Sequence, residues 1–260
     1  MFPIAHAWMI EQCVPEPTLA PYLGCVWPDM LYGSPLTHQQ THREGVALAA
    51  YAASLPPGDE ADEFRQFVQG ALSHSVEPHG FDWYSDEEYG GLPASERGYA
   101  FQRGRQLADR AASACGVAPD QGWWKAHNLI EMAFERRLFS ERPERGERIA
   151  IACADAALAE RISTHLARHF GQPAEALAVP IQRFPQVVEL RPTTIESLAR
   201  TYAMQTRLRH PGAQPDEAAL ANLIAEAEAI VASDGDEFLQ TSAQAVSTML
   251  NSAFSSAFSD

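Results

Sequence analysis

The sequence contains no long hydrophobic run. Hydrophobic residues make up 46% of its 260 residues, yet no stretch reaches the roughly 18 apolar residues that a membrane-spanning helix requires. The first dozen residues have neither a basic region nor an extended apolar segment, so they do not resemble a secretory signal. We therefore expect a cytoplasmic protein, with enough chain to bury a large core.

Positive charge is scarce. The chain has 19 lysine and arginine residues against 34 aspartate and glutamate residues, which gives a net charge of −15. Such a field repels nucleic acid and anionic membranes, so no non-specific nucleic-acid binding is expected. A small-molecule or phosphoester substrate stays compatible with this charge, because bound divalent cations reverse its sign locally. Homo-oligomers are also compatible with it.

Cysteine is also sparse, and no Cys-x-x-Cys pair occurs. The four cysteines lie far apart, at positions 13, 25, 115 and 153. This spacing argues against a zinc site built from thiolates. Two disulfides are compatible with the even number, but buried free thiols in a reducing cytoplasm are the expected state.

Alternating strand patterns are almost absent, whereas apolar residues recur at helical spacing in an alanine-rich chain. The pattern predicts an all-α protein, a multi-helix bundle. The histidine and carboxylate residues considered below lead us to expect a metal site in its N-terminal half. Segment 181–192 alone has strand character, and the proline- and glycine-rich segments 17–36 and 76–94 are predicted to be mainly loop. The predicted helices are 4–13, 37–55, 59–74, 95–114, 121–138, 148–169, 173–178, 193–209, 215–232 and 236–256.

The division of the chain follows from these elements. Residues 1–140 are expected to form a metal-binding helical core, and residues 141–260 a helical extension. Because no low-complexity linker separates them, we expect both to pack as one domain. The extension would serve as a helical cover or as a dimer surface.

The segment Lys125-Ala-His-Asn-Leu-Ile-Glu131 carries the most informative pair of side chains. His127 and Glu131 are four residues apart, so they share one face of the predicted helix. An imidazole and a carboxylate placed in this way can bind one ion, although the same spacing also occurs on solvated helices. The pair gains weight from other candidate ligands earlier in the chain: His6, Asp29, His42 (or His38), His74, His79 and Asp82.

The order of these residues resembles the zinc-dependent phospholipase C and S1/P1 nuclease superfamily. The likeness covers about residues 1–135. It rests on an early helical His6, the turn Gly24-Cys-Val-Trp-Pro-Asp29, and a histidine 13 residues later, His42. The helix end Gly70-Ala-Leu-Ser-His74 and the later His127-x-x-x-Glu131 follow in the same order.

This resemblance implies a helical enzyme that hydrolyses phosphoester bonds with one to three zinc ions, or other divalent transition ions, through a metal-bound hydroxide. It implies Asp29 as the catalytic carboxylate. The chain departs from the family where an aspartate is usual, because position 78 is proline. Glu77, His79 or Asp82 is expected to replace that ligand. The family's secreted members also bind metal through a mature N-terminal Trp, whereas this chain begins with Met1.

Two other functions compete with a hydrolase. A catalytically inactive protein of the same fold, with a metal or a ligand merely bound, is favoured by Pro78. An HD-type metal phosphohydrolase is also helical and rich in histidine, but it requires adjacent His and Asp residues. The sequence has no such pair.

Overall fold

The computed structural model describes residues 2–31, 33–86, 98–192 and 194–257. Helices account for the regular structure in these ranges, with no strand among them, so the all-α prediction is confirmed. The α-helices are α1 (Pro3–Cys13), α2 (Leu19–Gly24), α3 (His38–His42), α4 (Gly45–Ser54), α5 (Asp59–His74), α6 (Phe81–Ser85), α7 (Tyr99–Gly104), α8 (Ala108–Cys115), α9 (Gly122–Glu141), α10 (Glu144–Ala154), α11 (Ala156–Phe170), α12 (Ala174–Val187), α13 (Ile195–Arg209), α14 (Glu217–Val231) and α15 (Gly235–Ala257). Short 3₁₀ turns are η1 (Trp27–Asp29), η3 (Arg105–Leu107) and η4 (Pro119–Gln121).

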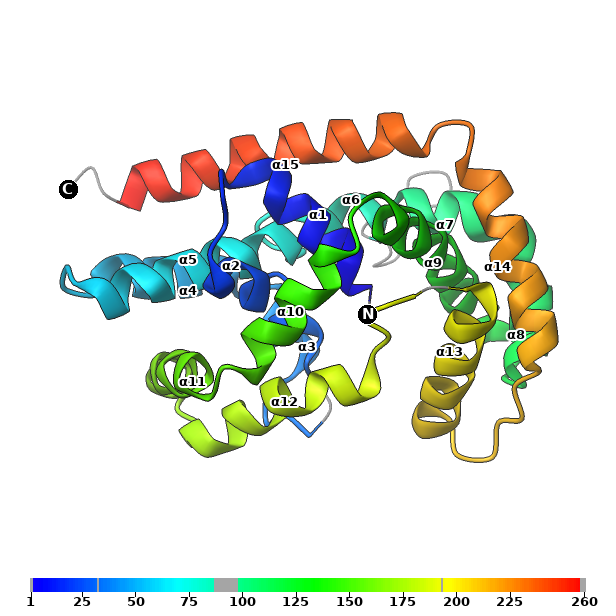
Figure 1. Ribbon diagram of the computed structural model, residues 1–260, viewed down its shortest axis with the longest axis horizontal. Helices are drawn as coiled ribbons and strands as arrows, with labels where there is room; N and C mark the ends of the chain where they lie inside the picture. Colours follow the sequence, from blue (N-terminus) through cyan, green and yellow to red (C-terminus); the bar gives the residue numbers. More distant parts are fainter. Residues whose placement is uncertain (1, 32, 87–97, 193, 258–260) are drawn as a thin grey trace.

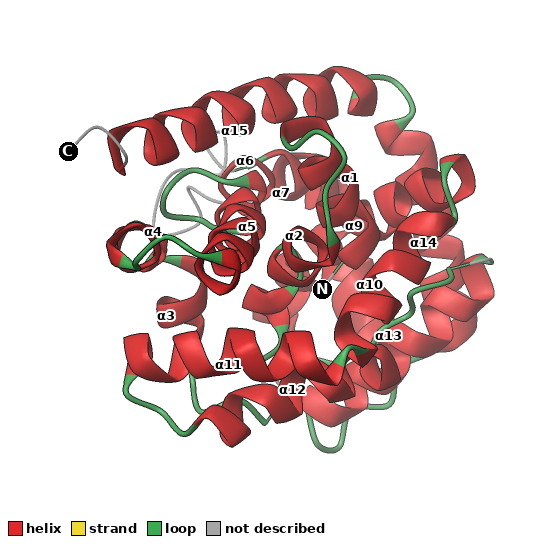
Figure 2. Cartoon of the chain, turned by 60° about the vertical axis from the view of Figure 1, so that its left-hand side comes forward, coloured by secondary structure: helices red, strands yellow, loops and turns green. Residues whose placement is uncertain are grey.

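Helix α9 occupies the centre of the fold. It packs against α1, α7, α8 and α14, which come from both halves of the chain. The long C-terminal helix α15 runs along one side, over α1, α4 and α5 (Figure 1). Helices α11 and α12 pair on the opposite side (Figure 2). The helices after residue 140 therefore pack directly on those before it, with α10 on α1 and α2.

Segments 148–169 and 37–55, each predicted as a single helix, are both divided into two helices. Segment 148–169 falls into α10 and α11, because the Asp155 side chain accepts a hydrogen bond from Leu158 N and caps a new helix. Segment 37–55 falls into α3 and α4. At this break the carbonyl of His42 accepts hydrogen bonds from Val76 N and Glu77 N at 2.8 and 2.9 Å. The break thereby ties α3 to the segment that follows α5.

The strand prediction for 181–192 is wrong, because α12 continues to Val187. Its buried residues Leu177, Ile181 and Phe184 recur at helical spacing, and tertiary packing on α10 and α11 overrides the local β-propensity. Both loop predictions are also partly wrong. Segment 17–36 contains α2 and η1, and segment 76–94 contains α6.

Segment 95–114 is built differently from the single helix predicted for it. Its described part contains α7, η3 and α8 in succession. Residues 95–97 of that predicted helix, and residues 87–94 of the predicted loop, lie outside the described residues.

The four cysteines are free thiols, and Cys25, Cys115 and Cys153 are buried. No helix of the described ranges has the length and apolar character needed to cross a membrane.

Helices α2 and α5 cross in backbone contact at two glycines. A Cβ atom at Gly70 would lie 2.3 Å from the carbonyl oxygen of Pro21, and one at Gly24 would lie 2.0 Å from that of Phe67. These distances leave no room for a side chain. The close crossing brings the carbonyl of Cys25, just after α2, to the end of α5, where His74 lies.

We predict that Gly70→Ala destabilises the protein despite its helical position. Alanine normally stabilises a helix relative to glycine by about 1 kcal/mol. Here overpacking between α2 and α5 should reverse the sign and cost about 1–3 kcal/mol. Urea unfolding followed by circular dichroism measures the difference. Gln69→Ala, on the same helix and half-buried, is the control. Equal or greater stability of Gly70→Ala would contradict the close crossing.

Candidate metal centre

Histidine and carboxylate side chains from five segments line one cavity of about 350 Å³. The described residues contain three groups of potential metal ligands. Within each group the ligand-type atoms lie within 4.8 Å of one another, so each group could hold a metal ion. The groups are His6, His74 and Asp82; Asp29, His42 and His74; and Asp86, His127 and Glu131. They come from α1, η1, α3, α5, α9 and the segment formed by α6 and Asp86 directly after it.

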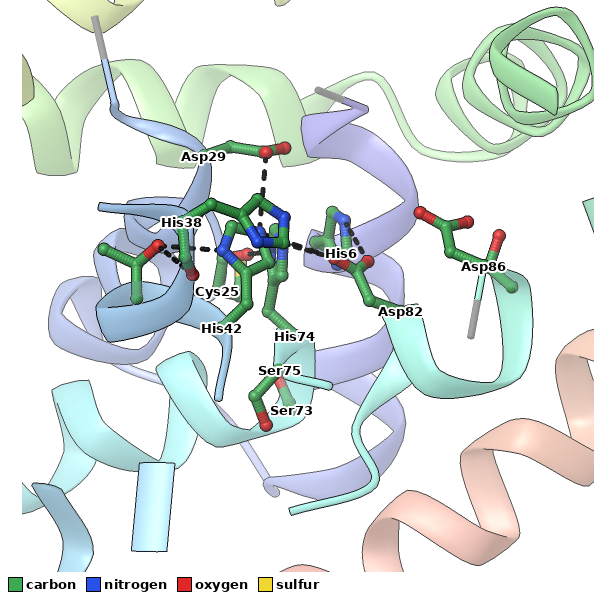
Figure 3. Close-up of polar contacts among 12 residues, drawn as sticks. His6, Cys25, Asp29, His38, His42, Ser73, His74, Ser75, Asp82 and Asp86 are labelled. Atoms are coloured by element: carbon green, nitrogen blue, oxygen red, sulfur yellow. Dashed lines mark hydrogen bonds and ion pairs between the residues drawn. The ribbon is translucent and has the colours of Figure 1, made fainter. Parts of the chain in front are cut away.

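Asp82 is the carboxylate on which the first two groups converge. Its Oδ2 atom lies 3.1 Å from His74 Nε2 and 3.6 Å from His42 Nε2, and its Oδ1 atom lies 3.5 Å from His6 Nε2. Asp29 approaches His42 from the other side, with 3.8 Å between Oδ1 and Nε2 (Figure 3). Asp82, His6, His42 and His74 are buried, so their charges act on one another with little screening.

Three histidines are oriented by their second ring nitrogen. His74 Nδ1 lies 2.7 Å from the Cys25 carbonyl oxygen, and His127 Nδ1 lies 2.5 Å from that of Trp124. A carbonyl only accepts, so these Nδ1 atoms carry the proton and direct Nε2 toward the cluster. His42 Nδ1 lies 2.8 Å from the Thr41 hydroxyl, which holds the ring as either donor or acceptor. A protein oxygen that holds one nitrogen of a histidine is the usual support of a metal ligand.

The third group lies one helical turn farther along the cavity. Asp82 and Asp86 are four residues apart, so the short helix α6 presents both to the same side. His127 Nε2 lies 3.7 Å from both Asp86 Oδ2 and Glu131 Oε2. Ser85 donates a hydrogen bond to Glu131 Oε1 at 3.0 Å, which fixes the carboxylate without neutralising it.

The electrostatics of the cluster favour a cation. Burial raises the pKa of Glu131, and the neighbouring Asp86 raises it further. Burial lowers the pKa of His127 to about 4, so the imidazole is neutral. His6 Nδ1 and Asp86 Oδ1 are buried without a hydrogen-bond partner in the described structure. Burying a carboxylate oxygen or an imidazole nitrogen without a partner costs folding free energy. A divalent ion bound between these atoms would supply the missing partner and offset that cost.

His74 and Asp29 show the opposite balance. Burial by itself lowers the pKa of His74, but Asp82 and Asp29 raise it to about 8. Burial also opposes ionisation of Asp29, yet nearby positive charge, that of His74 included, keeps the pKa of its carboxyl below the usual value. The Asp29 side chain is 22% exposed, more than that of Asp82 at 12%. It is therefore an ionised carboxylate that faces the cavity.

The structure brings together all but one of the residues predicted as ligands. His79 is the exception: its exposed ring stacks on Trp83 at 3.6 Å, away from the cluster. Of the three candidates for the place of Pro78, Asp82 lies in the cluster, whereas Glu77 pairs with Arg43 at 2.7 Å. His38 stacks on His42 and lines the cavity.

Asp86 was missed by the sequence analysis as a ligand. The segment around it is predicted to be mainly loop, and in a loop the spacing of residues does not show which way their side chains point. Its four-residue distance from Asp82 was the available signal, and this signal has meaning only if the segment is helical.

Glu135 connects the central helix to the start of α1. Its carboxylate accepts hydrogen bonds from Ile4 N at 3.0 Å and from Ala5 N at 2.8 Å. These are first-turn amides, which have no partner within their own helix. Glu135 is itself buried, and burial raises the pKa of its carboxyl to about 8. The contact fixes α1, and with it His6, against the helix that carries His127 and Glu131.

Comparison with known proteins gives no relative. No protein-family model matches the chain, and neither the curated proteins nor the solved structures provide a match. The functional conclusion therefore depends on the geometry of the centre.

We predict that Glu135→Ala costs about 2–5 kcal/mol of unfolding free energy, since it leaves two buried amides without an acceptor. Glu135→Gln keeps one acceptor oxygen and should therefore lose less unfolding free energy than Glu135→Ala. Chemical denaturation measures both variants. Glu141→Ala, at the exposed end of the same helix, serves as control. If Glu135→Ala were as stable as Glu141→Ala, the proposed anchoring of α1 would be wrong.

We predict that Asp86 and His79 differ in their effect on metal content. Asp86→Ala should lose about one equivalent of bound zinc after reconstitution, because the third group keeps only two ligands. His79→Ala should retain the wild-type content. Elemental analysis of the dialysed proteins measures both, and a loss in His79→Ala alone would reverse the assignment.

Proposed function

We propose that this protein is a metal-dependent hydrolase of phosphoester bonds. The observation that carries the proposal is the convergence of Asp82 on three histidines, with the Asp86 group beside it in the same cavity. Mixed imidazole and carboxylate donors suit zinc and related transition ions better than calcium or magnesium. A cavity lined by several such groups can take more than one ion.

The donor set limits how the ions can be arranged. His74 belongs to the first two groups, but its Nδ1 is engaged with the Cys25 carbonyl. Only Nε2 is left, so His74 can serve one ion at a time. Asp82 has two oxygens that face different histidines, so it would be available to more than one ion. One to three ions are compatible with these donors.

Bound divalent ions would supply Lewis acidity, lowering the pKa of water and offsetting charge on a phosphoryl group. The protein's own contribution is a base and a shaped site. We assign the base to Asp29, whose ionised carboxylate faces the cavity. It takes a proton from water as the water oxygen bonds to phosphorus. The bond from phosphorus to the ester oxygen breaks, and the leaving alcohol recovers the proton.

The resemblance in residue order supports the same proposal. The weak point of that resemblance was Pro78, in place of the usual aspartate. Asp82 offers a carboxylate to His6, His42 and His74, so a carboxylate stands in the cluster without help from position 78. The chief reason to prefer an inactive relative of the family is thereby weakened.

Metal content and turnover test the proposal in two stages. Fewer than about 0.3 equivalents of any transition metal, with no gain on reconstitution, would exclude a metal centre. The loaded protein is then assayed with a generic phosphomonoester and a generic phosphodiester. Bound metal with no hydrolysis of either substrate identifies the alternative function, a metal- or ligand-binding protein without catalysis.

We predict that Asp29→Asn lowers kcat by a factor on the order of 10²–10⁴, the usual contribution of a general base. The amide oxygen can still approach an ion, so most of the bound metal should remain. Elemental analysis and steady-state kinetics on the same sample separate the two effects. His127→Ala is the contrasting variant and should lose both metal and turnover. Unchanged kcat in Asp29→Asn would assign the base elsewhere.

A further inference from the structure

Arg209 is the one permanently charged cation among the described residues that line the metal cavity. It is the last residue of α13 and comes from the C-terminal half of the chain, outside the segment in which all the candidate ligands lie. Its side chain is exposed, so it stands at the mouth of the cavity. Because the chain has a net charge of −15, the presence of a cation beside this cavity calls for an interaction that accounts for it.

A buried hydrogen bond links α13, which carries Arg209, to α9. Asn128, which follows the candidate ligand His127, donates a hydrogen bond to the Tyr202 hydroxyl at 2.8 Å. Tyr202 and Arg209 are seven residues apart, about two helical turns, so they lie on the same face of α13. Asn128 lines the cavity as well. Arg209 is therefore held in register with the helix that carries His127 and Glu131.

The packing of the fold does not use the charge of Arg209. Arg207, on the same helix, pairs with Glu217 at 3.2 Å. Arg209 forms no such pair with a carboxylate of the described chain, although four carboxylates share its cavity. A cation at a helix C-terminus does interact favourably with the helix dipole, but that role requires no cavity. Its guanidinium has donors to offer to a ligand in the cavity.

The remaining lining limits the size and character of such a ligand. A cavity of about 350 Å³ is near the lower end of small-molecule sites. Phe2, Leu31 and Trp124 form an apolar part of its wall. A polymeric nucleic acid is opposed both by this size and by the negative charge of the chain.

We propose that Arg209 binds the phosphoryl group of a small phosphomonoester with an apolar or aromatic leaving group. This inference rests on the proposed hydrolase function. A monoester has three non-bridging oxygens, so oxygen remains for the guanidinium when metal ions take the others. A diester has two and must also fit a second organic group into the cavity. Arginine matches phosphate oxygens through paired N–H donors, which lysine cannot reproduce.

The test uses the zinc-reconstituted full chain and the variants Arg209→Ala, Arg209→Lys and Arg207→Ala. Inorganic phosphate is titrated by calorimetry, which requires no turnover. We expect phosphate to bind about tenfold or more weakly to Arg209→Ala, the usual loss for a charge-assisted contact. Arg209→Lys should fall between, and Arg207→Ala should match the wild type. Equal phosphate affinity in Arg209→Ala and the wild type, or no binding to either, overturns the inference.

A kinetic comparison tests the substrate class. We expect a higher kcat/KM for p-nitrophenyl phosphate than for bis(p-nitrophenyl) phosphate, and we expect Arg209→Ala to lose more activity on the monoester. A preference of the wild type for the diester overturns the choice of monoesters. Zinc and phosphate bound in an Arg209-dependent manner, with neither ester cleaved, would refute the hydrolase proposal while the phosphate contact stands.

Discussion

The contact between Glu135 and the first turn of α1 holds the two ends of the metal centre together. Helix α9 contributes His127 and Glu131, and one turn later Glu135 accepts hydrogen bonds from Ile4 N and Ala5 N. The central helix thus carries ligands of one group and also positions His6 of another. Arg145 reinforces the arrangement, because it bonds to Glu11 of α1 and to the carbonyl of Leu138 in α9. Without the Glu135 contact, two first-turn amides of α1 would be buried with no acceptor.

The centre itself depends on a balance between orientation and charge. Carbonyl oxygens fix the protonated nitrogen of His74 and His127, and so direct the other nitrogen inward. The Thr41 hydroxyl contacts the corresponding nitrogen of His42. Among the carboxylates that these histidines face, Glu131 is buried beside Asp86, and burial together with this neighbour raises the pKa of Glu131. A fold that orients bare nitrogens and ionised oxygens at one point carries an energetic cost in the absence of a cation. On the proposed function, metal binding and stability would therefore be linked in this protein.

The sequence was informative where spacing and residue type carried meaning without long-range context. The helical class followed from apolar periodicity, and the pairing of His127 with Glu131 followed from a four-residue interval in a strongly periodic segment. Asp86 could not be found, because its direction depends on α6, a short helix inside a segment rich in turn-forming residues. The sequence also could not show that the ring of His79, just before α6, stacks on Trp83. Arg209 could not be connected to the site at all, since its place depends on the tertiary fold, in which Tyr202 of α13 contacts Asn128 of α9.

The close crossing of α2 and α5 has a consequence for ion selectivity. Backbone contact at Gly24 and Gly70 leaves neither helix room to slide, and the Cys25 carbonyl that holds His74 belongs to this rigid unit. A donor set attached to stiff backbone cannot expand or contract to follow the ionic radius of its guest. It would reject a large ion that demands six to eight oxygens, and it would also fail to close around an ion smaller than the one it fits. The two glycines, which touch no ligand directly, would thereby help to set which metal the cavity accepts.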